Sequence, residues 1–408
     1  MGQGGLPSVL GAAHLTGLAT AAPVSVDTMK LLVLVTDAFG GRGGVAKFNR
    51  DLLRALCLHR DVAQVTALPR VMIEDAGVLP AGLVYESAAA SGKAAYLYCL
   101  GRLLDRDNDF GGVVCGHVHL LPLAAIAARW YRVPLILVIH GVEAWRRPRI
   151  PAMGRCVRAV NAFVSVSRLT KERFLEWAPL REDQGHVIPD CVELSKFTFG
   201  PKPAHLLKRY GLTGRRVIMT LARLSASERY KGFDEVLELM PSLVQEMPDL
   251  VYVIAGDGDD RPRLHNKASR LGISERVVFA GYIPEHEKAD HFRLADAFVM
   301  PGRGEGFGIV YLEAMACGIP VVASKADASR EAVLDGQLGL LVNPDNPQEI
   351  RAAIQEALNR PRRFQKELEY FSSERFIARW HAVLHQTFCK SEFALGNALS
   401  ALRHGSDR

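Results

Sequence analysis

The stretch KLLVLVTDAFGGRGGVAKFNRDLLRAL, residues 30–56, decides the fold class. It opens with a continuous apolar run at 31–35, which is typical of a strand buried on both faces of a parallel sheet. A glycine-rich loop follows at 40–44. Apolar residues then recur at helical spacing, at Val45, Phe48, Leu52, Leu53 and Leu56. A buried strand, a glycine loop and an amphipathic helix together indicate an α/β fold.

The same alternation continues through the rest of the chain. Strand-like runs lie at 62–68, 112–115, 134–139, 162–166 and 186–188. A proline-bounded linker follows at 189–203, and the runs restart at 217–221, 251–255, 277–280, 297–300, 320–323 and 339–342. We therefore predict two Rossmann-like domains, 29–198 and 199–365, facing each other across a cleft.

The two ends of the chain are predicted separately. Residues 1–28 read as a flexible extension. Residues 366–408 read as a helical tail. The helical pattern of that tail is visible from 362 to 389 in an apolar set formed by Phe364, Leu368, Phe371, Phe376, Trp380 and Leu384.

Size and composition set broad limits on function. With 408 residues, the chain is long enough for about two domains. A net charge of +6 does not choose between anionic lipid and phosphorylated substrates, and no motif points to nucleic acid. The seven cysteines lack the pairing of a zinc site and suggest a reducing compartment. No apolar run approaches the ~20 residues that span a bilayer, so we expect a cytoplasmic protein.

The glycine loop suits a diphosphate. Gly43 and Gly44 precede a helix whose free N–H groups favour an anion. The spacing Gly41-x-Gly43-x-x-Ala46 also matches a dinucleotide fingerprint, but no acidic residue closes the second strand, which disfavours nicotinamide binding. A tight turn without a ligand is the other interpretation.

The second glycine-rich segment, MPGRGEGFGIVYLEAMACGIP at 300–320, carries two acids. Glu305 lies in the loop and Glu313 follows eight residues later, just over two helical turns. Carboxylates accept strongly from paired hydroxyls, and the amides of Phe307 and Gly308 suit a sugar oxygen or a phosphate. Helix capping is the structural alternative for either glutamate.

Two cations follow the first strand of the second domain. Arg223 lies at the strand end and Lys231 near the next helix start. Such a pair would neutralise the charge that develops on a leaving diphosphate. The alternative is an exposed basic pair with no ligand, and Arg229 is predicted to face solvent.

Taken together, these motifs resemble the retaining glycosyltransferase family 4, the glycosyl transferases group 1 of GT-B fold. The resemblance rests on Glu305-Gly-Phe-Gly with Glu313, on Arg223 and on Lys231-Gly232, and extends over most of the second domain. In the first domain it is sparser and covers Gly43-Gly44-Val45 and His140-Gly141. The chain departs from the family in having Asp190-Cys191 after the linker proline and a longer interval between Arg223 and Lys231.

The resemblance implies a role for each matching position. Arg223 and Lys231 would bind the donor diphosphate, and Glu305 the hydroxyls of the transferred sugar. The ribose would meet Glu313. The remaining expected contacts are His140 beside the reacting carbon, Gly43 and Gly44 at the phosphate or acceptor, Tyr282 and Ile283 beside the base, and Gly306, Phe307 and Gly308 in the sugar loop. The helical tail would cross back to the first domain.

The function that this implies is retaining transfer of a mannose- or glucose-type hexose, from GDP-mannose or UDP-glucose, to a glycan or lipid-linked acceptor in polysaccharide or glycolipid assembly. We expect no metal and no cofactor, because Arg223 and Lys231 stabilise the leaving group. The alternatives are a nucleotide-sugar hydrolase or epimerase, and a silent nucleotide-sugar-binding protein.

Basic and aromatic residues also gather on the predicted acceptor domain, at 129–132, 145–149, Arg155 and Arg158. Such a patch favours peripheral contact with an anionic membrane, on the inner face of the cell membrane. A solvated surface is the other interpretation.

Overall fold

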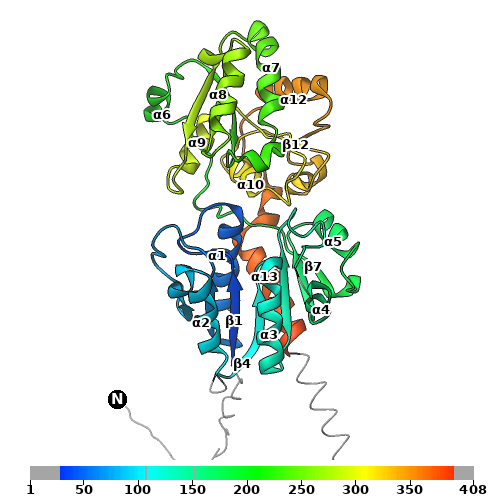
Figure 1. Ribbon diagram of the computed structural model, residues 1–408. Helices are drawn as coiled ribbons and strands as arrows, with labels where there is room; N and C mark the ends of the chain where they lie inside the picture. The colour runs from blue at the N-terminus through cyan, green and yellow to red at the C-terminus, as the bar shows by residue number, and fades with distance from the viewer. Residues whose placement is uncertain (1–27, 106–107, 151, 390–408) are drawn as a thin grey trace, which may run out of the picture.

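The computed structural model describes residues 28–105, 108–150 and 152–389. The chain forms two lobes, one above the other, with the helical tail returning from the upper lobe to the lower one (Figure 1). Residues 1–27 of the predicted extension and residues 390–408 of the predicted tail lie outside the described residues.

The first lobe contains a seven-stranded parallel sheet in the order β3-β2-β1-β4-β5-β6-β7. Its strands are β1 (Met29–Val35), β2 (Val62–Pro69), β3 (Leu83–Tyr85), β4 (Phe110–Cys115), β5 (Leu135–Ile139), β6 (Ala162–Ser165) and β7 (Gly185–Val187). The helices are α1 (Gly44–Cys57), α2 (Lys93–Leu103), α3 (Leu121–Tyr131), α4 (Met153–Arg158) and α5 (Arg168–Leu175). Strand β3 was not predicted from the sequence, because this three-residue edge strand is only partly buried and lacks a long apolar run.

The second lobe contains a six-stranded parallel sheet in the order β10-β9-β8-β11-β12-β13. Its strands are β8 (Arg216–Leu221), β9 (Leu250–Ala255), β10 (Val277–Gly281), β11 (Ala297–Val299), β12 (Val321–Ser324) and β13 (Leu340–Val342). The helices are α6 (Ala204–Arg209), α7 (Phe233–Glu246), α8 (Arg261–Arg270), α9 (Lys288–Leu294), α10 (Ile309–Ala316), α11 (Ser329–Ala332) and α12 (Pro347–Asn359).

Short helical turns complete the connections between these elements. The 3-10 turns are η1 (Ser87–Ser91), η2 (Val118–Leu120), η3 (Glu182–Gln184), η4 (Ala226–Lys231), η5 (Ser274–Arg276), η6 (Leu334–Gly336) and η7 (Lys366–Phe371). The last described turn is the π-helix η8 (His385–Cys389).

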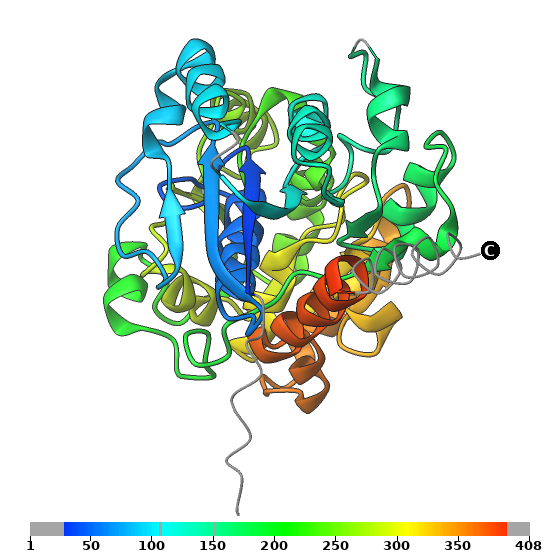
Figure 2. The same cartoon turned by 90° about the horizontal axis from the view of Figure 1, so that it is seen from below.

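The tail helix α13 (Ser373–Leu384) packs on α1 of the first lobe. The ring of Phe48 lies 5.4 Å from that of Phe376 and 6.4 Å from that of Trp380, both fully buried in the tail. Figure 2 shows this orange-to-red helix beside the blue α1. Helix α13 therefore attaches the described part of the tail to the first domain.

One detail of the predicted tail is wrong. Residues 361–365 are not helical, and the Phe364 side chain is exposed. Pro361 comes two residues after α12 ends at Asn359, and proline cannot continue a helix. The buried apolar set therefore begins at Leu368.

Each sheet reverses its strand order at one point, between β1 and β4 in the first and between β8 and β11 in the second. Ligands of open α/β sheets bind beyond the carboxyl ends of the strands at such points. The loops after β1, β4, β8 and β11 are therefore the natural places for a site.

Candidate functional site

The two domains touch through bare backbone. A Cβ atom on Gly306, in the loop after β11, would lie 1.9 Å from the carbonyl oxygen of His140 and 2.8 Å from the Cα of Gly141. A Cβ on Gly141, after β5, would in turn lie 2.9 Å from the Cα of Gly306. Only glycine lets two main chains approach this closely. This glycine pair brings the predicted donor loop against the predicted acceptor domain.

Beside this contact, Lys231 and Glu305 form an ion pair. The Nζ of Lys231 donates to the Oε1 of Glu305 at 2.5 Å, and both side chains are largely buried. Burial disfavours the ammonium, but the attraction of Glu305 outweighs this cost and raises the pKa of Lys231. The structure thus brings together two of the residues predicted to hold the sugar and the diphosphate.

The peptide groups of Glu305 are held by the segment before α11. The Glu305 amide donates to the Asp327 carboxylate at 2.9 Å, and the Ala328 amide donates to the Glu305 carbonyl at 3.0 Å. Burial and the nearby Glu305 charge raise the pKa of Asp327 to about 6. The loop is therefore positioned by hydrogen bonds on both sides of Glu305.

Arg223 lies at the end of β8 with most of its side chain exposed, hydrogen-bonded to Glu228. Glu228 also lies 3.9 Å from Lys231, so one carboxylate faces both predicted diphosphate-binding cations. Sequence reasoning missed Glu228. The available signal was that Glu228 is the one acid in the longer interval between the two cations.

Arg229 pairs with Asp260 and is half exposed, in agreement with its predicted solvent-facing position.

Glu313 is separate from the Lys231–Glu305 pair. Its side chain is fully buried in α10 and accepts from the Nζ of Lys288, at 3.2 Å to one oxygen and 3.3 Å to the other. Burial raises the pKa of Glu313, and Lys288 offsets part of that shift. The predicted ribose contact stays a prediction that requires this buried pair to open, since the carboxylate has no exposed surface here.

On the facing domain, His140 follows β5. Its Nε2 lies 2.8 Å from the carbonyl oxygen of Gly116, so Nε2 carries a proton. The Phe48 ring contacts the imidazole edge-on at 5.0 Å. The stacked ring of His117 lies 6.1 Å away, and burial followed by the repulsion of His140 lowers the pKa of His117 to about 4. His117 is thus a neutral neighbour of His140, the predicted catalytic histidine. His117 itself was not predicted from the sequence.

The glycine loop after β1 leaves open space at the start of α1. Gly43 has a φ of +92°, and a Cβ on Gly43 or Gly44 would meet nothing within 4 Å. From the same loop, the Arg42 guanidinium lies 4.3 Å from the ring centroid of Tyr282, in the second domain. Tyr282, which is predicted to flank the base, thus contacts the opposite domain and is half exposed. Ile283, the other residue predicted beside the base, is buried.

The remaining residues of the predicted sugar loop lie at the start of α10. Gly308 has a φ of +92° and precedes the helix, so its backbone adopts a conformation that favours glycine. The Phe307 side chain is buried against Phe371, at 5.6 Å between ring centroids. Only main-chain groups of these residues are thus placed to meet a ligand.

A second contact between the domains joins α11 of the second lobe to the start of α5 in the first. The Glu331 carboxylate, from α11, accepts from the amides of Arg168 at 2.8 Å and Leu169 at 3.0 Å. These are the first free N–H groups of α5, where a negative charge is stabilising. Arg168 also pairs with Asp335 at 2.5 Å. No local sequence pattern predicts this contact, because its partners are 163 residues apart.

Comparison with known proteins gives the family. A family model described as Glycosyltransferase Family 4 matches residues 42–196, and one described as Glycosyl transferases group 1 matches residues 208–375. The chain belongs to glycosyltransferase family 4. Among similar curated proteins, the GDP-mannose-dependent alpha-(1-6)-phosphatidylinositol monomannoside mannosyltransferase of Mycobacterium tuberculosis is 30% identical over 272 residues, covering 63% of this chain and 69% of that protein.

The protein of the same name from Mycolicibacterium smegmatis is 37% identical over 220 residues, which span 52% of this chain and 56% of that relative. A D-inositol 3-phosphate glycosyltransferase of Nocardiopsis dassonvillei is 26% identical and covers 84% of this chain and 88% of that protein.

Solved structures of other proteins share the fold. Anabaena HepE, solved with UDP and glucose, superposes with a TM-score of 0.65 at 21% identity, over 91% of this chain and 99% of that one. The lipopolysaccharide outer core galactosyltransferase WaaB has a TM-score of 0.63 at 16% identity, over 88% and 99%. The fold of this family 4 chain is therefore GT-B, as predicted.

We predict that Gly306→Ala separates the domains, because the added methyl group would overlap the His140 carbonyl. Small-angle scattering should show a larger radius of gyration, while circular dichroism shows intact secondary structure. The matched control is Gly101→Ala, in the exposed face of α2, where a Cβ meets nothing. An unchanged radius for Gly306→Ala would show that the backbone contact does not set the domain spacing.

We further predict that Glu331→Ala lowers the free energy of unfolding by about 2 kcal/mol, because α5 loses its charged N-terminal partner. Chemical denaturation measures this. Glu172→Ala removes an exposed acid from the same helix and should change stability by no more than about 0.5 kcal/mol. Equal effects of the two substitutions would argue against the Glu331 contact.

Proposed function

We propose that this family 4 chain transfers a mannosyl group from GDP-mannose, with retention at the anomeric carbon and without a metal ion. The observation that carries the proposal is the buried Lys231–Glu305 pair, placed beside the backbone contact between Gly306 and His140. An anion-binding group and a hydroxyl-binding group lie together on one domain, facing the predicted catalytic histidine of the other.

The choice of donor follows from the relatives. Two of the similar curated proteins are named as GDP-mannose-dependent mannosyltransferases. The UDP complexes of HepE support only the fold, at 21% identity, so UDP-glucose is the second donor to test.

The mechanism follows from the charges. As the bond between the sugar carbon and the phosphate oxygen breaks, negative charge grows on the diphosphate, and Lys231 and Arg223 stabilise it. These two cations supply the stabilisation for which other transferases use a divalent ion. Glu305 accepts from hydroxyls of the sugar. The acceptor hydroxyl attacks the face that the phosphate leaves, and its proton passes to the departing phosphate oxygen.

The acceptor also follows from the relatives, whose names contain a phosphatidylinositol mannoside or an inositol phosphate. We propose an acceptor built on phosphorylated inositol, free or carried by a lipid, and hence a role in glycolipid or glycan assembly. This narrows the wider glycan or lipid-linked class that the sequence predicts.

For a lipid-borne acceptor, we propose that the enzyme docks peripherally on an anionic membrane, on its cytoplasmic side. The predicted basic patch supports this proposal. Helices α3 and α4 pack together, so their parts of the patch lie side by side. The arginines of the patch are exposed: Arg129, Arg132, Arg146, Arg147, Arg149, Arg155 and Arg158. Each such cation near an anionic surface contributes about 1 kcal/mol. In the described residues, no helix is long and apolar enough to cross a membrane.

The first test is transfer itself. We expect mannosyl transfer from GDP-mannose to a phosphatidylinositol mannoside, unchanged in excess EDTA, with an α-linked product by NMR. Glu305→Gln should lower kcat about 100-fold or more, because an interaction made at the reacting sugar is lost. The control Glu172→Gln should leave the rate unchanged. Hydrolysis of GDP-mannose at the same rate with and without acceptor would identify a hydrolase instead.

The second test is vesicle flotation. We expect binding to vesicles with anionic lipid and release as salt rises, because the attraction is screened within about 10 Å at 0.1 M salt. Equal flotation with neutral vesicles, or binding that is insensitive to salt, would contradict the membrane proposal.

A further inference from the structure

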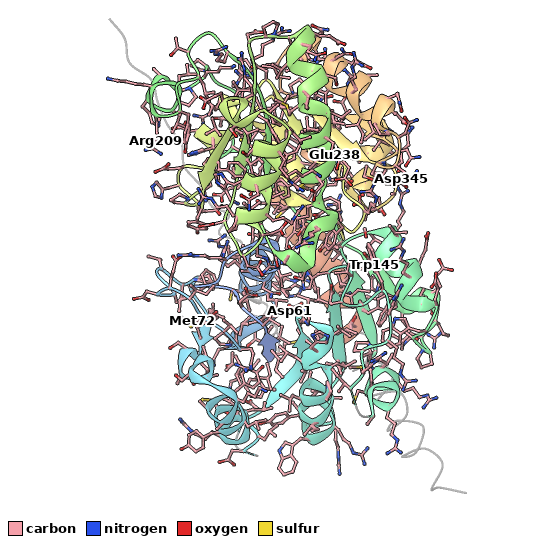
Figure 3. The ribbon with its side chains drawn as sticks, turned by 45° about the horizontal axis from the view of Figure 1, so that its top comes forward. Asp61, Met72, Trp145, Arg209, Glu238 and Asp345 are labelled. Carbon is pink, nitrogen blue, oxygen red and sulfur yellow. The ribbon has the colours of Figure 1, made fainter. Side chains whose placement is uncertain are left out.

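A cavity of about 340 Å³ lies on the first domain, outside the Lys231–Glu305 site. It is lined by Trp145 and Arg146 from the loop after β5 and by Arg173 and Glu176 at α5. Figure 3 labels Trp145 close to the seam between the two lobes. The lining contains two guanidinium groups and one carboxylate, so the cavity has a net positive charge.

The cavity wall is held in place by two contacts. The indole N–H of Trp145 donates to the Thr170 hydroxyl at 3.1 Å. The Arg173 guanidinium lies over the Trp145 ring, 4.0 Å from its centroid. Stacking uses the face of a guanidinium and leaves its edge N–H groups available for a second partner. Arg173 is thus positioned before any ligand arrives, at little further entropic cost.

The charge of these two arginines is not neutralised by a carboxylate. Among the residues that the structure describes, neither Arg146 nor Arg173 has an acidic partner within ion-pair distance, Glu176 included. Other cations near the domain contact are occupied: Lys47 pairs with Asp51 at 2.7 Å, and Arg168 pairs with Glu331 and Asp335. A preformed guanidinium without a carboxylate favours an anionic ligand.

The position of the cavity relates it to the reaction. Trp145 follows His140 by five residues, so their Cα atoms lie at most about 18 Å apart. The same helix, α5, begins at the amides that Glu331 holds from the second domain. A ligand in the cavity would therefore lie along the helix whose first turn makes this domain contact.

We propose that this cavity binds the phosphate of the acceptor, with Arg146 and Arg173 as its donors and Trp145 as the apolar wall against the inositol ring. This inference rests on the proposed function and deepens it. The recognised chemistry is a phosphate ester of a ring polyol. It applies to a free inositol phosphate and to a phosphatidylinositol headgroup.

The test is steady-state kinetics of Arg173→Gln and Arg146→Gln, with D-inositol 3-phosphate in one arm and phosphatidylinositol mannoside vesicles in the other. We expect the acceptor KM to rise about 10- to 100-fold, since each substitution removes a hydrogen bond from a charged donor. The donor KM and the hydrolysis of GDP-mannose without acceptor should stay unchanged. Arg173→Lys should recover only part of the loss, because an ammonium cannot bind bidentately.

The matched control is Arg102→Gln, which removes an exposed arginine from α2 of the same domain and should leave both arms unchanged. A rise in KM in both arms supports recognition of the phosphate itself, and a rise for Arg173→Gln in one arm alone identifies the source of the acceptor. An unchanged acceptor KM for both cavity variants, in a wild-type enzyme that does transfer, overturns the subsite alone. Absence of transfer by the wild-type enzyme with every acceptor overturns the proposed function instead. Arg146 is exposed, so its variant remains informative if Arg173→Gln fails to fold.

Discussion

The arrangement of this protein depends on a place where two main chains meet without side chains between them. Gly306 and Gly141 face each other across the domain boundary, and any Cβ there would overlap backbone atoms. Because the contact is made by backbone, the spacing of the domains is set to within the width of a methyl group. The loop of Glu305 and the loop of His140 are therefore brought together directly. The Glu331 contact with α5 holds a second point, so the domains are restrained against rotation as well as separation.

Around this contact, buried charges neutralise one another. Lys231 pairs with Glu305, and Lys288 pairs with Glu313 and Glu285. Removing an isolated charge from water costs several kcal/mol, so each of these groups needs a partner. A donor that brings its own diphosphate and hydroxyls can replace those partners without leaving a charge unsatisfied. Asp190, in the linker, is the exception, because burial raises its pKa to about 7.

The two domains present different chemical groups at their loops. The second domain carries the Glu305 loop with its Lys231 ion pair, and its motifs were dense enough to indicate the family. The first domain presents arginines and tryptophan from the loop after β5 and from α5. No short motif predicts these residues, because they come from two segments of the chain that only the fold brings together.

The sequence by itself determined the two parallel sheets, since continuous apolar runs such as 31–35 suit only strands buried on both faces. It also indicated Glu305, Lys231 and His140, which lie in local motifs in the segments that follow β11, β8 and β5. It missed β3, and it placed Phe364 in the core although Pro361 keeps that segment out of the helix. Only the tertiary structure decided that Glu313 is buried with Lys288, that Glu331 reaches α5, and that Arg173 stacks on Trp145. The reason is physical: strand and helix patterns depend on residues that are neighbours in the chain, whereas these pairings join residues that are distant in the sequence and meet only after the elements have packed, within a domain or between the two.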